Sequence, residues 1–132
     1  MPGLTASVAA LTGPHLGVDL VDIAACGARL TAGGAALLER IYTEDELDFA
    51  RGRVERLATR LAAKEAVLKA LGTGIRGIGL REVEVRVDPD GKPTIRLNGA
   101  AARRASDLGL DGVAISMSHE AGYAIAFAAG YQ

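Results

Sequence analysis

A helix predicted for residues 53–71 carries charged side chains beside apolar surface on both of its faces, and this pattern most constrains the fold. At about 3.6 residues per turn, one face presents the leucines Leu57, Leu61, Leu68 and Leu71. The opposite face presents the alanines Ala62, Ala63, Ala66 and Ala70. Lys64 lies inside the leucine stripe and Glu65 at its edge. Because buried charges require partners, we expect Lys64 to meet a buried carboxylate or backbone carbonyl groups.

The rest of the chain mixes helical and strand periods, which predicts an α+β fold with one long central helix packed on a small antiparallel sheet. The first strand is apolar on both faces, so we expect both faces to be covered. Glu46 stands at the third helical position after Thr43, which predicts a capping box. The expected elements are a strand at 15–23; a helix from an Asp22 cap to 30; a break at 31–34; helices at 35–41, 43–50 and 53–71; a loop at 72–79; strands at 80–87 and 93–97 around a turn at 88–91; a helix at 99–108 after an Asn98 cap; and a hairpin of 112–118 and 123–128.

Length and composition predict a single domain at 15–132, preceded by an N-terminal extension at 1–14 that lacks the positive charge of a signal peptide. No segment reaches the roughly 20 apolar residues of a membrane span. The net charge of −1 gives no general attraction to nucleic acid. The single cysteine, Cys26, leaves no internal disulfide and predicts a cytoplasmic protein.

Charge is unevenly distributed around the long helix. Between residues 51 and 69, two glutamates stand against a larger set of basic residues, namely Arg51, Arg53, Arg56, Arg60, Lys64 and Lys69. Such a stretch suits an anionic ligand, and it also suits an ordinary solvated helix face.

Two carboxylates in apolar surroundings are the candidates for a metal site. Asp19 interrupts the first strand, where aspartate is rare, and Glu65 borders the leucine stripe. A buried carboxylate needs a cation, N–H donors or a proton. Together the two side chains suit Mg²⁺, which prefers oxygen ligands. The alternatives are a loop hydrogen bond for Asp19 and an i,i+4 ion pair of Glu65 with Lys69.

Two other groups of residues have both a structural and a functional interpretation. Gly72 and Gly74 follow the end of the long helix, so they form a C-cap and turn or contact phosphate together with Lys69, and the Walker spacing is absent. His119 follows Ser116 and Ser118, but no G-x-S-x-G elbow indicates a serine hydrolase. Its alternative role is a structural hydrogen bond.

Four segments, in order along the chain, resemble the motifs of the holo-acyl-carrier-protein synthase family, the small bacterial 4′-phosphopantetheinyl transferases. They are GVDLVDI at 17–23, RLAAKEAVLKALGTGI at 60–75, GKP at 91–93 and SMSH at 116–119. The second segment is the most specific, and the similarity spans about residues 16–128. The resemblance implies the 4′-phosphopantetheinyl transferase fold.

The resemblance also implies a reaction. A serine hydroxyl of an apo acyl carrier protein would attack the β-phosphate of coenzyme A, so that 4′-phosphopantetheine is transferred and 3′,5′-ADP leaves. Asp19 and Glu65 would be the Mg²⁺ ligands, Lys69 would neutralise phosphate charge, and the base would be Glu65 or a metal-bound water. The coenzyme A site would be lined by Arg60, Lys69, Gly72, Thr73, Gly74, Pro93 and His119, with Arg51 and Arg53 near the 3′-phosphate.

The expected assembly is a homotrimer with coenzyme A in the cleft between neighbours, and the expected partner is a carrier protein of fatty-acid or polyketide synthesis. The chain departs from the family in the helix after the first motif, where Arg29 is the only cation and several arginines often meet the acidic carrier. We therefore expect weaker electrostatic steering toward a strongly acidic carrier, or a different carrier altogether.

Two alternatives remain beside the enzyme. One is a noncatalytic module on the same fold that binds coenzyme A or a carrier protein, and the other is a structural α+β domain whose charges pair internally. The combination of Asp19, Glu65 and Lys69 favours the enzyme.

Overall fold

The structure is a computed structural model that describes residues 14–74 and 77–132. The extension predicted for residues 1–14 lies outside the described residues, apart from Pro14. Residues 75–76 of the loop predicted at 72–79 lie outside them as well.

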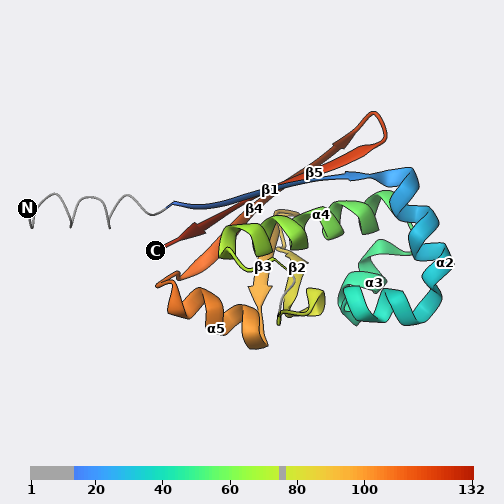
Figure 1. Cartoon of the computed structure of the whole chain (residues 1–132). Coiled ribbons are helices and arrows are strands. Elements are labelled where there is room, and N and C mark those ends of the chain that lie inside the picture. Colours follow the sequence, from blue (N-terminus) through green and yellow to red (C-terminus); the bar gives the residue numbers. More distant parts are fainter. Residues whose placement is uncertain (1–13, 75–76) are drawn as a thin grey trace, which may run out of the picture.

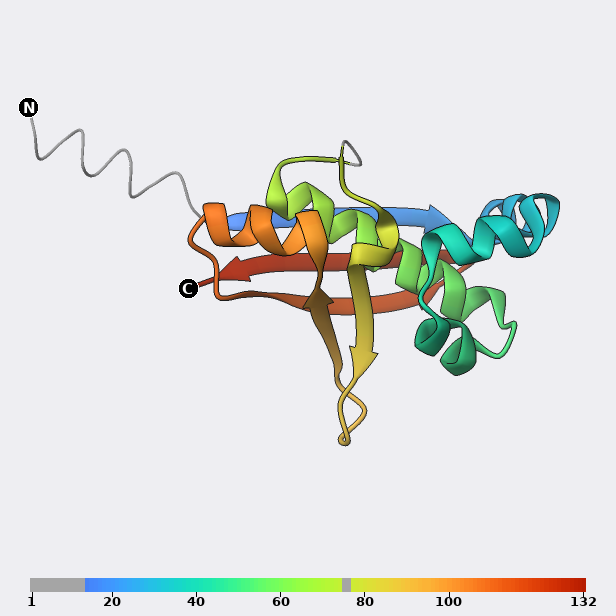
Figure 2. The same ribbon diagram turned by 90° about the horizontal axis from the view of Figure 1, so that it is seen from below.

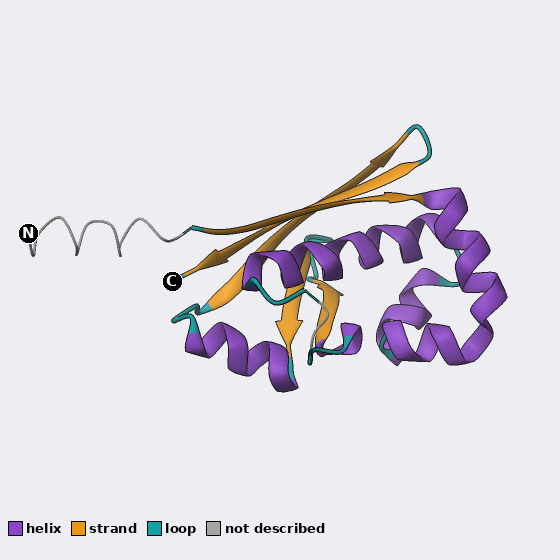
Figure 3. Cartoon of the chain, viewed as in Figure 1, coloured by secondary structure: helices purple, strands orange, loops and turns teal. Residues whose placement is uncertain are grey.

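Helices and strands are mixed along the chain, so the predicted α+β class is confirmed (Figures 1 and 3). The elements are β1 (His15–Asp22), α2 (Ile23–Ile41), α3 (Glu44–Ala50), α4 (Val54–Leu71), the 3-10 turn η1 (Leu80–Glu82), β2 (Val83–Val87), β3 (Pro93–Leu97), α5 (Gly99–Asp107), β4 (Gly112–Glu120) and β5 (Tyr123–Tyr131). The strands form two antiparallel sheets rather than the single sheet expected, one in the order β1-β5-β4 and one of β2 and β3.

Helix α4 is buried because it lies between two layers (Figures 1 and 2). The three-stranded sheet covers one side of α4, while β2, β3 and α5 lie on the other. Helices α2 and α3 close one end of the molecule. This arrangement explains why the sequence of α4 is apolar on both faces.

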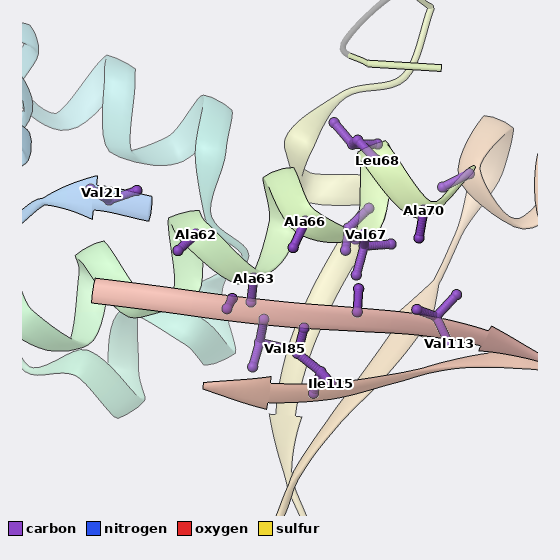
Figure 4. Close-up of a cluster of buried hydrophobic side chains, with 14 of the residues drawn as sticks. Val21, Ala62, Ala63, Ala66, Val67, Leu68, Ala70, Val85, Val113 and Ile115 are labelled. Carbon is purple, nitrogen blue, oxygen red and sulfur yellow. The ribbon is translucent and has the colours of Figure 1, made fainter. Parts of the chain in front are cut away.

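The alanine face of α4 packs against the three-stranded sheet (Figure 4). Ala62, Ala63 and Ala66 are fully buried there. Glycine at position 17 lets the two backbones approach closely, since a Cβ atom on Gly17 would overlap the Ala66 carbonyl oxygen. The small side chains therefore place β1 directly against α4, with Asp19 at the following inward position of the strand.

Lys64 on the other side of α4 is fully buried, and its partners are of both expected kinds. Its ammonium group donates to Glu46 Oε1 at 2.7 Å and to the carbonyl oxygens of Val83 at 2.6 Å and Leu80 at 3.1 Å. Burial lowers the pKa of Lys64, while the Glu46 charge opposes that shift. Glu46 Oε2 also accepts from the Val85 N–H at 2.9 Å. One ion pair thus joins α3, α4 and β2.

Two of the three predicted N-terminal caps form as expected, with a side chain that accepts from the first turn of its own helix. Thr43 and Glu46 form the predicted capping box at the start of α3. Asp22 caps α2 by accepting from the Ala25 N–H at 3.0 Å. Asn98 begins α5 without a side-chain bond, and Glu82 accepts from the Ala100 N–H at 2.7 Å instead.

The break predicted at 31–34 is confirmed and narrows to Gly34, whose non-helical backbone, with a φ of 65°, separates two helical segments within α2. Three other expectations about local structure are corrected. Residues 80–82 form η1, and the strand starts at Val83. The final strands extend to residues 112–120 and 123–131, so His119 lies within β4. One face of β1 is exposed rather than covered, since Leu16 and Leu20 are 57% and 61% accessible.

Membrane-spanning helices were sought among the described residues, and none combines the length and apolar character needed to cross a bilayer.

Replacing Lys64 by methionine tests the role of the buried ion pair. We expect Lys64→Met to lower the free energy of unfolding by about 3–5 kcal/mol, because Glu46 and two carbonyl groups lose their cation in a buried site. Lys92→Met, at an exposed position, is the matched control and should change stability by less than about 0.5 kcal/mol. Equal urea midpoints for the two variants would contradict a stabilising role for this contact.

Candidate active site

Asp19, Glu65 and Lys69 come together where β1 crosses α4, and we call them the carboxylate–lysine cluster. Lys69 Nζ lies 3.0 Å from Asp19 Oδ1 and donates to the Val18 carbonyl oxygen at 2.9 Å. Lys69 therefore pairs across elements with Asp19 rather than with Glu65 one turn away. The lysine side chain is 55% exposed, so its ammonium group stays open to a ligand.

The second oxygen of Asp19, Oδ2, is buried and has no hydrogen-bond partner in the described part of the chain. Glu65 lies beside it: burial, followed by the neighbouring Asp19 carboxylate, raises the pKa of Glu65 to about 7. An unpaired buried acceptor next to a second carboxyl group is costly unless a cation occupies the space between them.

The donor set of this cluster fits a hard divalent cation. No group of three or more His, Cys, Asp or Glu side chains that could hold a metal occurs among residues 14–74 and 77–132. Two carboxylates are nevertheless sufficient for Mg²⁺, which keeps several ligand positions for water and substrate phosphate. The unpaired Oδ2 of Asp19 is the observation that makes the fit specific.

Three other predicted residues, Arg60, Pro93 and His119, line a separate cavity of about 240 Å³. We call it the arginine pocket. Arg60 is 5% exposed, its Nε has no hydrogen-bond partner in the described residues, and its guanidinium carbon lies 4.2 Å from the Phe49 ring centre. Burial lowers the pKa of Arg60. A buried, incompletely bonded guanidinium facing a cavity is a site for an anion.

The arginine pocket and the carboxylate–lysine cluster lie on different sides of α4. At about 100° per residue, Arg60 and Glu65 point about 140° apart around the helix. Glu65 instead borders an apolar cavity of about 230 Å³ next to α2, whose lining shares no residue with the arginine pocket. Six of the site residues predicted from the sequence therefore form two groups within one chain: Asp19, Glu65 and Lys69 in the cluster, and Arg60, Pro93 and His119 in the arginine pocket.

The glycine loop after α4 is a C-cap and turn. Gly72 is the left-handed cap with a φ of 72°, and its N–H donates to the Lys69 carbonyl oxygen at 3.0 Å. Arg104 Nε donates to the Leu71 carbonyl oxygen at 2.9 Å and holds this end of the helix. The loop residues Gly72, Thr73 and Gly74 thus lie at the C-terminal end of α4, near Lys69. Arg60 lies nearer the N-terminal end of the helix.

The remaining predicted cations are outside the arginine pocket. Arg51 and Arg53 are exposed in the turn between α3 and α4, and neither belongs to the pocket lining. Phe49 and Arg56 do line it, and both were missed by the sequence reasoning. The i,i+4 spacing of Arg56 and Arg60 was the available signal, because it puts both side chains on one face of the helix.

Comparison with known proteins gives a consistent result over nearly the whole chain. Residues 15–128 match the model of the 4′-phosphopantetheinyl transferase superfamily. A holo-[acyl-carrier-protein] synthase from Herpetosiphon aurantiacus is 43% identical over 121 residues, which cover 86% of this chain and 95% of the relative. Another from Desulforudis audaxviator is 45% identical over 116 residues, covering 86% and 88%.

Solved structures agree with the sequence comparisons. The crystal structure of the Neisseria meningitidis holo-[acyl-carrier-protein] synthase superposes with a TM-score of 0.81 at 34% identity, covering 89% of this chain and 98% of that one. The Helicobacter pylori synthase in complex with coenzyme A gives a TM-score of 0.79 at 27% identity, covering 87% and 98%. The fold built around α4 and the ordered motifs are thus those of one family: the chain belongs to the holo-[acyl-carrier-protein] synthases of the 4′-phosphopantetheinyl transferase superfamily.

Proposed function

We propose that this enzyme transfers 4′-phosphopantetheine from coenzyme A to a serine of an apo acyl carrier protein, giving holo carrier protein and 3′,5′-ADP. The carboxylate–lysine cluster is the observation that carries the proposal, since an unpaired buried carboxylate oxygen and an open ammonium group suit a metal and a diphosphate. The solved relatives that bind coenzyme A support the choice of donor. The buried free Cys26 agrees with a cytoplasmic enzyme.

Asp19 and Glu65 would hold Mg²⁺, which when bound supplies positive charge to the diphosphate. Lys69, anchored by Asp19 and the Val18 carbonyl group, presents its charge to the phosphate that accepts the serine oxygen. The bond from the serine oxygen to the β-phosphorus forms as the bond to the 3′,5′-ADP oxygen breaks, and the serine proton goes to Glu65 or to a water. The amides of Gly72 and Thr73 are used by carbonyl groups of α4, so Gly74 would be the residue of this loop that offers a backbone amide near Lys69.

The separation of the two residue groups supports an assembly in which two copies complete one site. Arg60, Pro93 and His119 of one copy would hold one end of coenzyme A, and the carboxylate–lysine cluster of a neighbour would hold the diphosphate. The sheet offers a surface for this contact. Helix α4 lies on one side of the sheet (Figure 1), and the side chains on the face turned away from α4 are apolar and exposed. Its residues are Leu16, Val18, Leu20, Tyr123, Ile125 and Phe127. We propose the homotrimer that the family resemblance implies.

A noncatalytic module that binds coenzyme A or a carrier protein is the second candidate. The Asp19–Glu65 pair argues against it, because a module that only binds has no need for a second carboxyl group whose pKa is raised to about 7.

Transfer itself is tested with coenzyme A, Mg²⁺ and several apo carrier proteins, by the mass gained by the carrier. We expect wild type to add one phosphopantetheine, and Asp19→Ala and Glu65→Ala to reduce the rate roughly 100-fold or more, because each removes an oxygen ligand. Asp90→Ala, in an exposed turn, is the control and should match wild type. Coenzyme A binding without transfer to any carrier would establish the noncatalytic module, and full activity of both alanine variants would refute the site.

The raised pKa of Glu65 makes metal binding depend on pH. Below about pH 7 the metal-free protein holds a proton on Glu65 that a cation must displace, so Mg²⁺ affinity should fall with decreasing pH and level off above pH 7. Calorimetry at pH 6 and pH 8, in buffers of different ionisation enthalpy, should show proton release only at the lower pH. Exposed Glu39→Gln should leave this profile unchanged. Equal affinity at both values without proton release would contradict the assignment of Glu65.

A shared site predicts complementation between inactive chains. Arg60→Ala damages the arginine pocket and Glu65→Ala damages the cluster, so mixed assemblies contain some sites in which both halves are intact. Co-expression of the two chains should therefore restore activity well above the sum of the separate variants. The pair Asp19→Ala and Glu65→Ala is the matched control, because both damage the same half and should restore nothing. If the first pair also restored nothing although mixed assemblies formed, each chain would carry a complete site.

A further inference from the structure

Two arginines of α4 meet at one aromatic side chain in the arginine pocket. The guanidinium carbon of Arg60 lies 4.2 Å from the Phe49 ring centre, and that of Arg56 lies 5.2 Å from it. Arg56 Nη1 also donates to the Phe49 carbonyl oxygen at 3.0 Å. Phe49 therefore holds both cations in place through its ring and its backbone.

Neither guanidinium is neutralised by the described residues. No ion pair of Arg56 or Arg60 is formed within residues 14–74 and 77–132. The acidic residue in the pocket lining is Glu55, and it is not within salt-bridge distance of either. Burial lowers the pKa of Arg60, and the charge of the buried Glu46 carboxylate opposes that shift. Glu46 is already bonded to Lys64 and backbone N–H groups. Two adjacent cations without a counter-charge repel each other, so the pocket is preorganised for a multiply charged anion.

The chemistry of the proposed donor identifies this anion. Coenzyme A carries negative charge at two places, the diphosphate and the 3′-phosphate of its ribose. The proposed function assigns the diphosphate to the carboxylate–lysine cluster, and the arginine pocket lies on the other side of α4. The 3′-phosphate is the remaining group with enough charge for two guanidinium ions.

We propose that Arg56 is the specificity-determining residue for the 3′-phosphate, acting beside Arg60, and that this role does not belong to Arg51 or Arg53. The inference rests on the proposed function. One N–H of Arg56 is used by Phe49, which leaves its other donors for phosphate oxygens in the fork geometry of an arginine. Ser118 and His119, in the same lining, add hydrogen-bonding side chains from β4.

The test compares coenzyme A with 3′-dephospho-coenzyme A as donors in the full enzyme. We expect Arg56→Gln to raise KM for coenzyme A roughly tenfold and to leave kcat and the KM for the dephospho donor nearly unchanged. Arg56→Lys should recover part of the loss, because it keeps the charge without the fork. Arg103→Gln, at an exposed position on α5, is the matched control and should behave as wild type with both donors.

Three results would overturn the proposal while leaving the transferase intact. The first is a wild-type enzyme that does not discriminate between the two donors, and the second is an equal rise in KM for both donors in Arg56→Gln. The third is a loss of discrimination in Arg53→Gln but not in Arg56→Gln. The first would mean that the pocket does not bind the 3′-phosphate, and the second that Arg56 is merely structural. Absence of transfer from either donor by wild type would instead refute the proposed function itself. Thermal unfolding of each variant separates a loss of folding from a loss of recognition.

Discussion

The close packing of β1 against α4 is the constraint on which the rest of the structure depends. A strand and a helix can approach this closely only where both present very small side chains, and Gly17 faces Ala66 at the contact. Any Cβ at position 17 would push the strand away from the helix. The contact also sets the geometry of the carboxylate–lysine cluster, because Asp19 reaches Lys69 and lies beside Glu65 only when the two backbones are this near.

The opposite side of α4 is organised by the buried Lys64–Glu46 pair. Removing a lysine from water is costly, and here the ammonium group recovers the cost through a carboxylate and two carbonyl oxygens. The pair also ties α3 to α4. Phe49 lies one turn after Glu46 on α3, so the same ion pair brings its ring over Arg60 and Arg56. The buried Lys64–Glu46 pair thus positions the cations of the arginine pocket, although neither residue lines that pocket.

A single helix therefore carries two different electrostatic environments about 140° apart. The cluster toward β1 has an excess of carboxylate oxygens and attracts cations, while the pocket toward α3 has unneutralised guanidinium groups and attracts anions. Under the proposed function, a ligand with separated phosphates would bridge the arginine pocket of one copy and the carboxylate–lysine cluster of a neighbour. The exposed apolar face of the three-stranded sheet provides a reason for the copies to associate, since burying it removes large side chains such as Phe127 from water.

Local patterns in the sequence by themselves determined much of the secondary structure, and they singled out Asp19 and Lys69, which the fold brings within 3.0 Å. The Thr43–Glu46 capping box and the Asp22 cap followed from interactions within one turn of chain, and the two-faced pattern of α4 required cover on both sides. Tertiary structure alone decided the partner of Lys64, the exposure of the β1 face and the choice of Arg56 over Arg51 and Arg53 as the cation beside Arg60. The physical reason is that each of these depends on how separate elements dock. Side-chain periodicity shows which residues share a face, and only the packing of neighbouring elements shows what that face meets.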